Sequence, residues 1–458
     1  MLWSTCFSEE SIAYPRKSDG IRSHFQRDFD RLVFSSPFRR LQSKTQVFPL
    51  PGSKFVHNRL THSLEVASVG RSLGAMVGHY IAEHLVDAED HSTRNFYKNH
   101  LAYVVASACL AHDVGNPAFG HSGEKAISNY FINHAQTMID GQTLRSYFDE
   151  HQWSDLINFE GNANALRQLT KQYVGKHEGG LGLTITTLAS ILKYPCPSTQ
   201  VNASYKHRKK YGYFIADQEV YTIITEKLGF IKDPNAEGTY MRHPFVYLVE
   251  AADDICYSIM DMEDAHRLGI LSKEVVSSLF LRLVEQIEPE SHLTTVKRYE
   301  TIEDDNESIA YLRAKLINDL VQSCYAAFID NHDKILNGTY NETLMSSLND
   351  RVPAMQELIT MSVEKIYQHP HVLEIEIAGY NLMSELLQLY IPAALSKIKQ
   401  PQHKTILRLV PKQFTGDLES ESYYLRVMNI LDHISSMTDV YATEHFRRLK
   451  GIDISTLQ

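Results

Sequence analysis

The chain has 458 residues, 43% of them hydrophobic, which is enough apolar material for a sizeable core. Its formal net charge of −10 argues against non-specific binding to nucleic acids, so a polyanionic ligand would require a local basic pocket. The five cysteines are scattered without CxxC spacing, which argues against a disulfide framework and a zinc knuckle. No apolar run is long enough to cross a bilayer, so we expect a soluble cytoplasmic protein without a membrane partner.

Helical patterns follow one another along most of the chain. Apolar residues recur at spacings of three and four between Leu60 and Ile81, as one face of an amphipathic helix requires. Residues 101–110 are apolar nearly all round, which predicts a buried helix ending just before His112 and Asp113. Further helices are predicted over residues 124–134, 244–264, 275–287, 309–328, 355–367, 377–390 and 425–441, with one pattern beginning at residue 159 and another ending at residue 195.

Between these patterns lie segments that we predict to be loops. Pro49, Pro51 and Gly52 predict a turn. Polar composition predicts loops over residues 87–99 and 289–305, a looser region over 135–155 and a proline-containing, basic loop over 195–213. No alternating series is long enough to form a sheet core, so the predicted fold class is all-α.

The stretch from residue 110 to residue 124 concentrates groups that bind metals and move protons. It contains the pair His112–Asp113, a turn rich in Gly, Pro and Asn, and the pair His121–Glu124. Adjacent side chains on a helix diverge by roughly 100°, so His112 and Asp113 could share a metal only near a helix end or in a crowded bundle centre. The alternative for this first pair is a capped helix end with a solvated aspartate.

Further metal ligands would have to come from other segments. His62 lies in the first turn of the helix predicted from residue 60, and Asp253 lies in an otherwise apolar helical pattern. A charged side chain in an apolar helix costs several kcal/mol unless it is paired or bound to a metal. His62 and Asp253 are therefore the candidates that would complete the site.

Five separated motifs carry a resemblance to a known family. They are FRRLQSKTQV (38–47), NRLTHSLEV (58–66), HDVGNPAFGHSGE (112–124), FEGN (159–162) and HPFVYLVEAADDICYSIMDMED (243–264). In this order they resemble the HD-domain metal-dependent phosphohydrolases and, more narrowly, the bacterial dGTPase and dGTPase-like deoxynucleoside triphosphate (dNTP) triphosphohydrolases. The resemblance implies an HD-type helical bundle over residues 1–270. Residues 271–458 would form a C-terminal helical region, packed on the bundle and supplying oligomer contacts.

The resemblance also implies roles for individual residues. One divalent metal would be bound by His62, His112, Asp113 and Asp253. Mn²⁺ and Mg²⁺ are the first candidates, followed by transition metals other than manganese. His121 and Glu124 would handle protons beside the scissile bond, with His121 acting either as acid toward the leaving group or as base toward water. The implied substrate contacts are Arg59 with phosphate, Gln46 and Asn162 at the nucleotide, Lys193 and Tyr194 at the triphosphate, Tyr257 where a ribose 2′-hydroxyl would lie, and Asp261 at the 3′-hydroxyl.

Each of these residues also has an ordinary structural interpretation. His121 and Glu124 could be a helix N-terminus with an acidic first turn. Tyr257 could be a half-buried core aromatic and Asp261 part of a solvated face, although Asp253, Tyr257 and Asp261 share one helical face by spacing. An isolated Arg or Lys is more often a surface residue than a ligand contact.

The implied reaction is hydrolysis of dGTP, or of dNTPs broadly, to a 2′-deoxynucleoside and inorganic triphosphate. A second hypothesis is another HD phosphohydrolase, either a nucleotidase or a cyclic-nucleotide or alarmone phosphodiesterase. A third is a dNTP-sensing or single-stranded nucleic-acid-binding protein with little turnover. Relatives of the resembled family assemble as homo-oligomers, often hexamers. A dNTP or single-stranded DNA is a candidate effector, and residues 135–155 and 206–210 are the segments expected to vary with base preference and effector binding.

Overall fold

The computed structural model describes residues 1–13, 20–48, 56–349 and 351–453. Helices dominate this part of the chain, and its only sheet is the small antiparallel hairpin of β1 (Met138–Ile139) and β2 (Gln142–Thr143). The all-α prediction is therefore confirmed, whereas the turn predicted at Pro49, Pro51 and Gly52 lies outside the described residues. Within the described ranges, no helix combines the length and apolar character needed to span a membrane.

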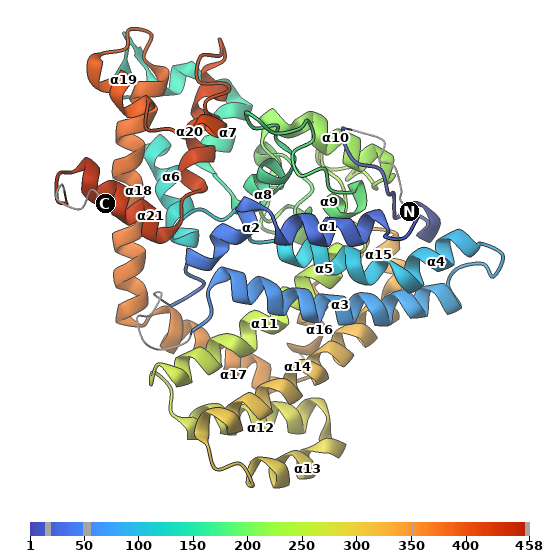
Figure 1. Ribbon diagram of the computed structural model, residues 1–458. Helices are drawn as coiled ribbons and strands as arrows, with labels where there is room; N and C mark the ends of the chain where they lie inside the picture. Colours follow the sequence, from blue (N-terminus) through green and yellow to red (C-terminus); the bar gives the residue numbers. More distant parts are fainter. Residues whose placement is uncertain (14–19, 49–55, 350, 454–458) are drawn as a thin grey trace.

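Three helices form the centre of the fold. They are α3 (Arg59–His84), α5 (Leu101–Ala111) and α11 (Val246–Arg267), which pack against one another. Figure 1 shows α3 beside α5 and α11 next to both. The backbone of α3 approaches α5 and α11 closely at Gly70, since an added Cβ would lie 2.5 Å from Sγ of Cys109 and 3.5 Å from Cβ of Ala252. This close approach brings the predicted metal-binding ends of the helices together.

A first hydrophobic cluster surrounds these three helices. Phe25 and Tyr97 belong to it on one side, and Leu279 and Leu312 on the other. The additional helices that contribute to it are α1 (His24–Val33), α2 (Ser36–Arg40), α4 (His91–Asn99), α8 (Gly161–Thr170), α9 (Ile185–Ile191), α10 (Gln218–Lys227), α12 (Lys273–Ile287), α14 (Asp305–Asp330), α15 (His332–Leu336), α16 (Ser346–Asn349) and α17 (Pro353–Met361). Helix α13 (Pro289–Tyr299) packs outside them, against α12 and α14.

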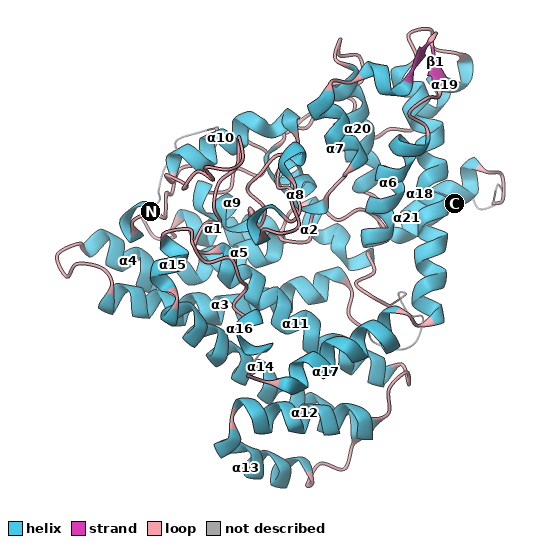
Figure 2. Cartoon of the chain, turned by 180° about the vertical axis from the view of Figure 1, so that it is seen from behind, coloured by secondary structure: helices cyan, strands magenta, loops and turns pink. Residues whose placement is uncertain are grey.

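A second hydrophobic cluster lies beside the first. The long helix α18 (Pro370–Leu395) runs along one side of the molecule and packs against α6 (Gly120–Asn133), as both views show (Figures 1 and 2). The other helices of this cluster are α7 (Glu150–Ile157), α19 (Pro401–Leu407), α20 (Tyr423–Ser435) and α21 (Asp439–Leu449), and α8 contributes Ala163. Both clusters combine residues from before and after position 270, and the division into 1–270 and 271–458 stays a prediction.

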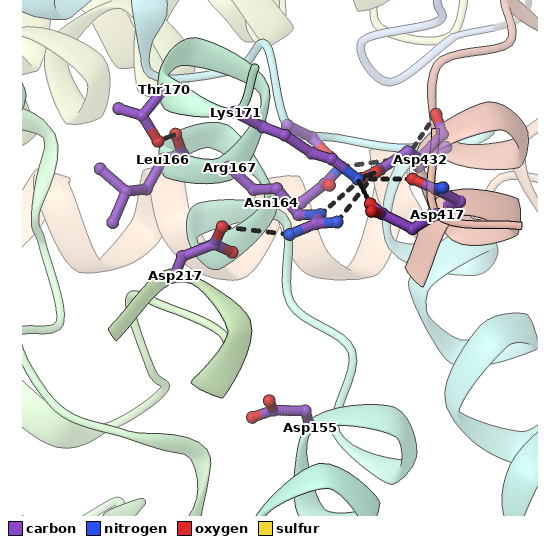
Figure 3. Close-up of polar contacts among 12 residues, drawn as sticks. Asp155, Asn164, Leu166, Arg167, Thr170, Lys171, Asp217, Asp417 and Asp432 are labelled. Atoms are coloured by element: carbon purple, nitrogen blue, oxygen red, sulfur yellow. Dashed lines mark hydrogen bonds and ion pairs between the residues drawn. The ribbon is translucent and has the colours of Figure 1, made fainter. Parts of the chain in front are cut away.

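Buried ion pairs join α8 to α20 (Figure 3). The guanidinium of Arg167 donates to both carboxylate oxygens of Asp432, at 2.7 and 3.0 Å, and to Asp217 at 3.1 Å. The ammonium of Lys171 donates to Asp432 at 3.0 Å and to Asp417 at 3.1 Å. Because Arg167, Asp217 and Asp432 are buried, removal of Arg167 would leave two buried carboxylates with less compensating charge.

The helix predictions succeeded where apolar residues form a clear stripe and failed where they do not. The loop predicted over residues 87–99 is wrong, because Asp90 caps α4 by accepting from the backbone N–H of Thr93 and only three of its residues are buried. The loop predicted over 289–305 is also wrong, since α13 begins with Pro289 at its first turn and buries only Thr295. The single helix predicted over 425–441 is two helices, α20 and α21.

Candidate active site

The ends of three helices bring three of the predicted metal ligands together. His62 lies in the first turn of α3, His112 directly follows α5, and Asp253 lies in the first half of α11. The Nε2 atoms of His62 and His112 lie 3.1 and 3.5 Å from Oδ1 of Asp253. One ligand atom from each residue lies within 4.8 Å of the other two, close to the span of two opposed metal–ligand bonds of about 2.0–2.2 Å.

The orientation of His112 suits a metal ligand. Its Nδ1–H donates to the carbonyl oxygen of Cys109 at 2.6 Å, which makes Nε2, 3.5 Å from Asp253, the atom that would bind a metal. Nε2 is buried and has no hydrogen-bond partner among the described residues. Although burial favours a neutral acid, the imidazoles of His112 and His62 hold the pKa of Asp253 well below its ordinary value. Two imidazoles and a carboxylate fit a borderline or hard divalent cation.

The fourth predicted ligand, Asp113, lies beside these three and is engaged by protein donors. Its Oδ2 accepts from Nη1 of Arg59 at 2.7 Å, and its Oδ1 accepts from the side-chain amide of Asn116. The same Oδ1 is 3.6 Å from Nε2 of His112. Asp113 is therefore close enough to approach a metal, and its role as a ligand stays a prediction.

A cavity of about 480 Å³ contains most of the predicted site. The predicted residues that line it are Gln46, Arg59, His112, Asp113, His121, Glu124, Asn162, Lys193, Tyr194, Asp253 and Tyr257. His62 and Asp261 do not line it; His62 is buried behind its neighbours. The cavity walls carry six carboxyl groups and four Lys or Arg side chains, so acidic and basic groups lie close to one another around it.

The predicted proton-handling pair lies at the start of α6, which places both side chains toward the cavity. Oε1 of Glu124 accepts from the backbone N–H of Gly161 at 2.8 Å, at the N-terminus of α8. Burial, with Glu160 adding to it, raises the pKa of Glu124 to about 7. The ring of His121 is open to the cavity, yet the surrounding protein displaces enough water to lower its pKa, and the charge of Lys210 acts in the same direction.

The predicted phosphate contacts are paired with carboxylates. Nζ of Lys193 lies 3.3 Å from Glu250, whose other oxygen accepts from Nη1 of Arg242 at 2.8 Å. Burial opposes the charged form of Lys193, but Glu250 outweighs it and raises the pKa of the ammonium. The ring of Tyr194 lies 6.0 Å from Nζ of Lys193. These cations are therefore held in place by carboxylates beside the cavity.

The predicted nucleotide contacts Gln46 and Asn162 differ in their present partners. Oε1 of Gln46 is buried and has no hydrogen-bond partner among the described residues, so it is free to accept from a ligand. The side-chain amide of Asn162 donates to Glu160 at 2.6 Å. Glu160 in turn forms an ion pair with Lys210, 2.9 Å away, on the same wall of the cavity.

The two predicted sugar contacts lie on α11 next to a residue of the C-terminal region. Tyr257 is 37% exposed, and its ring centroid lies 5.8 Å from that of Tyr367, in the π-helical turn Ser362–Tyr367. The hydroxyl of Tyr367 donates to Oδ2 of Asp261 at 2.7 Å. Burial raises the pKa of Asp261 to about 8. Asp261 is therefore buried, bound to Tyr367 and not part of the cavity lining.

Sequence reasoning missed several residues of the cavity wall. Lys210, Glu160, Glu250 and Asp254 line the cavity without having been assigned a role. Glu160 and Glu250 lie inside the FEGN motif and the motif of residues 243–264, so their position in a motif was the available signal. Lys210 lies in the predicted basic loop, where no helical periodicity indicates in which direction the side chain points.

Comparison with known proteins agrees with this geometry. Residues 59–194 match the HD domain family, and residues 349–448 match the phosphohydrolase-associated domain family. A deoxyguanosinetriphosphate triphosphohydrolase-like protein of Synechocystis sp. is 36% identical over 94% of this chain and 95% of its own length. The protein of the same name from Listeria innocua is 35% identical over 99% and 100%, respectively.

A relative from Klebsiella pneumoniae named deoxyguanosinetriphosphate triphosphohydrolase is 32% identical over 94% of both chains. HD domains are metal-dependent hydrolases, and the match to this domain begins at Arg59 and includes His62, His112 and His121. The identities extend through the C-terminal helices, so the similarity covers both hydrophobic clusters. The chain therefore belongs to the HD-domain hydrolases, in the family of the deoxyguanosinetriphosphate triphosphohydrolase-like proteins.

Proposed function

We propose that the protein hydrolyses dNTPs to a 2′-deoxynucleoside and inorganic triphosphate. The observation that carries the proposal is the placement of a three-residue metal-binding cluster, the His121–Glu124 pair and several cationic side chains around one cavity. The names of the relatives support the substrate class. Preference for dGTP over the other dNTPs is left to experiment.

The divalent cation would be bound by His62, His112 and Asp253 together with Asp113. When bound, it would polarise a phosphate oxygen and offset the negative charge of the phosphates. Mn²⁺ and Mg²⁺ are the first candidates, because carboxylates contribute to the donor set. Chelation should therefore abolish activity, and added metal should restore it.

The cationic side chains would bind the triphosphate. Arg59 and Lys193 face the cavity, and each is already held by a carboxylate. Held cations of this kind stabilise charge on the equatorial phosphate oxygens without having to reorganise during the reaction. Tyr194 lies beside Lys193 and would contact the same phosphates.

His121 and Glu124 would move the proton that hydrolysis requires. The leaving deoxynucleoside oxygen needs a proton, and the attacking water must lose one. Because the pKa of Glu124 is raised to about 7, this carboxyl group can gain or release a proton near neutral pH. His121 acts either as acid toward the leaving group or as base toward the water, and both roles require its position beside the α-phosphorus.

The sugar would lie along α11. Tyr257 would occupy the space of a ribose 2′-hydroxyl, Asp261 would bind the 3′-hydroxyl, and Gln46 and Asn162 would contact the nucleotide. Since Tyr367 now bonds to Asp261, sugar binding at Asp261 requires a shift of the Tyr367 hydroxyl. The same proposal includes a homo-oligomer, a hexamer by family resemblance, with contacts supplied by C-terminal helices. It also includes a cytoplasmic location.

Product analysis tests the proposal. The purified protein is incubated with each of the four dNTPs and Mn²⁺ or Mg²⁺, and the products are separated by ion-exchange chromatography. We expect deoxynucleoside plus triphosphate in equal amounts. Release of deoxynucleoside monophosphate plus pyrophosphate would contradict the proposed bond cleavage, and the absence of any product with either metal would contradict the enzymatic function.

A further inference from the structure

One buried carboxylate of the C-terminal region contacts two separate loops of the active site. Asp439 is the first residue of α21 and is 6% exposed. Its Oδ1 accepts from the backbone N–H of Phe119 at 2.9 Å, and its Oδ2 accepts from the backbone N–H of Thr45 at 2.8 Å. Both oxygens are therefore used to hold backbone, one on each loop.

The two loops carry residues that line the cavity. Thr45 directly precedes Gln46, whose buried Oε1 has no partner among the described residues. Phe119 lies two residues before His121, at the point where the turn enters α6. The single side chain of Asp439 thus fixes the distance between the loop of Gln46 and the loop of His121.

The backbone at Phe119 needs external support. Its φ of 61° lies in the left-handed region, which is unfavourable for a residue with a side chain. The ring of Phe119 packs directly on α18, because a Cβ on Gly379 would lie 2.4 Å from its Cγ. The hydroxyl of Ser122 also donates to the carbonyl oxygen of Glu376, at 2.5 Å. Helices of the C-terminal region therefore hold the turn on two sides.

A buried lysine links the same loops from the other direction. Nζ of Lys44 donates to the carbonyl oxygen of Asn116 at 2.5 Å and to that of Ser435, in α20, at 3.0 Å. Lys44 is 1% exposed and precedes Thr45. Burial lowers the pKa of the Lys44 ammonium to about 7, and the carboxylate of Asp439 partly opposes this shift, so the two loops are joined mainly by these hydrogen bonds.

We propose that Asp439 is a positioning residue that sets the geometry of His121 and Gln46 for the reaction. The proposal rests on the proposed dNTP hydrolysis for its effect on rate, and on the two hydrogen bonds for its effect on the loops. Asp439 would not touch the substrate. It would keep the turn of Phe119 and the loop of Thr45 in one fixed arrangement, so that the C-terminal region completes the site.

Asp439→Asn tests this directly. The substitution keeps the shape of the side chain, but its amide group can accept from only one of the two backbone N–H groups, so one loop is released. We expect turnover to fall about 10–100-fold, the size of effect that misplacement of a catalytic group by about 1 Å produces. Bound metal per chain should stay unchanged, because none of the metal ligands touches Asp439.

Asp155→Asn is the matched control. Asp155 is also buried and accepts from a backbone N–H, that of Ile215 at 2.8 Å, and from the hydroxyl of Tyr424 at 2.6 Å, away from both loops. The Asp155→Asn substitution should lower Tm by about as much as Asp439→Asn does. Its kcat should stay within about twofold of that of the unmodified protein. A difference in turnover between the two variants therefore reports loop position and not general stability.

Hydrogen exchange measured by mass spectrometry supplies a readout that does not depend on activity. Peptides containing Thr45 or Phe119 should exchange faster in Asp439→Asn than in Asp155→Asn, and the remaining peptides should match. If Asp439→Asn does not fold, Asp439→Glu, which displaces both oxygens by one methylene, is measured in the same way. Equal exchange in these peptides, or unchanged turnover with faster exchange, would overturn the proposal. If the unmodified protein hydrolyses no dNTP, the proposed function fails. The hydrogen-exchange rates of the two loops then still show whether Asp439 holds them.

Discussion

The two halves of the active site are built in different ways. The proposed metal-binding half consists of His62 and Asp253, on regular helices, and His112, directly after a third helix, inside one hydrophobic cluster. The proton-handling half, with His121 and Glu124, begins at an irregular turn with a left-handed residue and packs against helices of the second cluster. The first half is rigid because of its own helices, whereas the second depends on distant segments of the chain.

This difference in construction separates metal binding from proton transfer. Ligand atoms on packed helices keep their spacing without contacts from α18, α20 or α21. The turn that carries His121 is supported by α18, α20 and α21, so changes far from the cavity can alter proton transfer while metal binding survives. Variants that act on one half only should therefore be obtainable, and they test the comparison.

The largest effect is expected for a metal ligand. His62→Ala should remove the bound metal and lower turnover by about 10³-fold or more, because the metal supplies several kcal/mol of charge stabilisation. The control is His79→Ala, at an exposed position on the same helix α3, and it should keep both the bound metal and the turnover. Metal content measured by atomic emission alongside turnover decides the question. Full metal content in His62→Ala would show that the assigned ligand set is wrong.

A second variant acts on the buried connection between the clusters. Arg167→Ala leaves the carboxylates of Asp432 and Asp217 without this partner, so the free energy of unfolding should fall by about 3–5 kcal/mol. Arg282→Ala breaks the exposed pair with Glu357 and should cost about 0–1 kcal/mol. Urea denaturation compares the two. Similar losses in both variants would show that the connection contributes no more than a surface pair.

A smaller effect concerns α11, where a metal ligand and a predicted sugar contact share one helix. The pKa of Asp261 is raised to about 8 by burial, so the folded protein binds this proton more tightly than the unfolded chain does. Stability from this group is complete below about pH 4 and is lost as pH rises toward 8. Asp261→Asn should flatten the fall in Tm between pH 5 and pH 8 by a few degrees. Parallel Tm curves for the two proteins would contradict the buried, protonated carboxyl.

The sequence predicts that His62, His112 and Asp253 lie close together, partly for physical reasons. The apolar residues around His62 and Asp253 identify helices, and a buried charged residue in such a helix requires a partner. The resemblance then connected segments that lie far apart in the chain. His62, His112 and Asp253 lie together in the structure, as that prediction requires. Asp113 is not part of this group, and its carboxylate contacts Arg59 and Asn116.

The support of the proton-handling half could not be predicted in this way. Asp439 contacts Phe119 and Thr45 through backbone N–H groups, which leave no trace in the sequence of either loop. The same applies to Tyr367, whose contact with Asp261 depends on a π-helical turn that periodicity does not reveal. Short or polar helices such as α4 and α13 were missed because a cap and a few contacts stabilise them, not an apolar stripe.

The most direct test of the division between the two halves is His121→Ala, with bound Mn²⁺ and single-turnover rate measured on the same sample. We predict one Mn²⁺ per chain, as in the unmodified protein, and a rate about 10²–10⁴-fold lower, the usual size of a lost acid–base contribution. Loss of the metal in this variant, or an unchanged rate with the metal bound, would contradict the account.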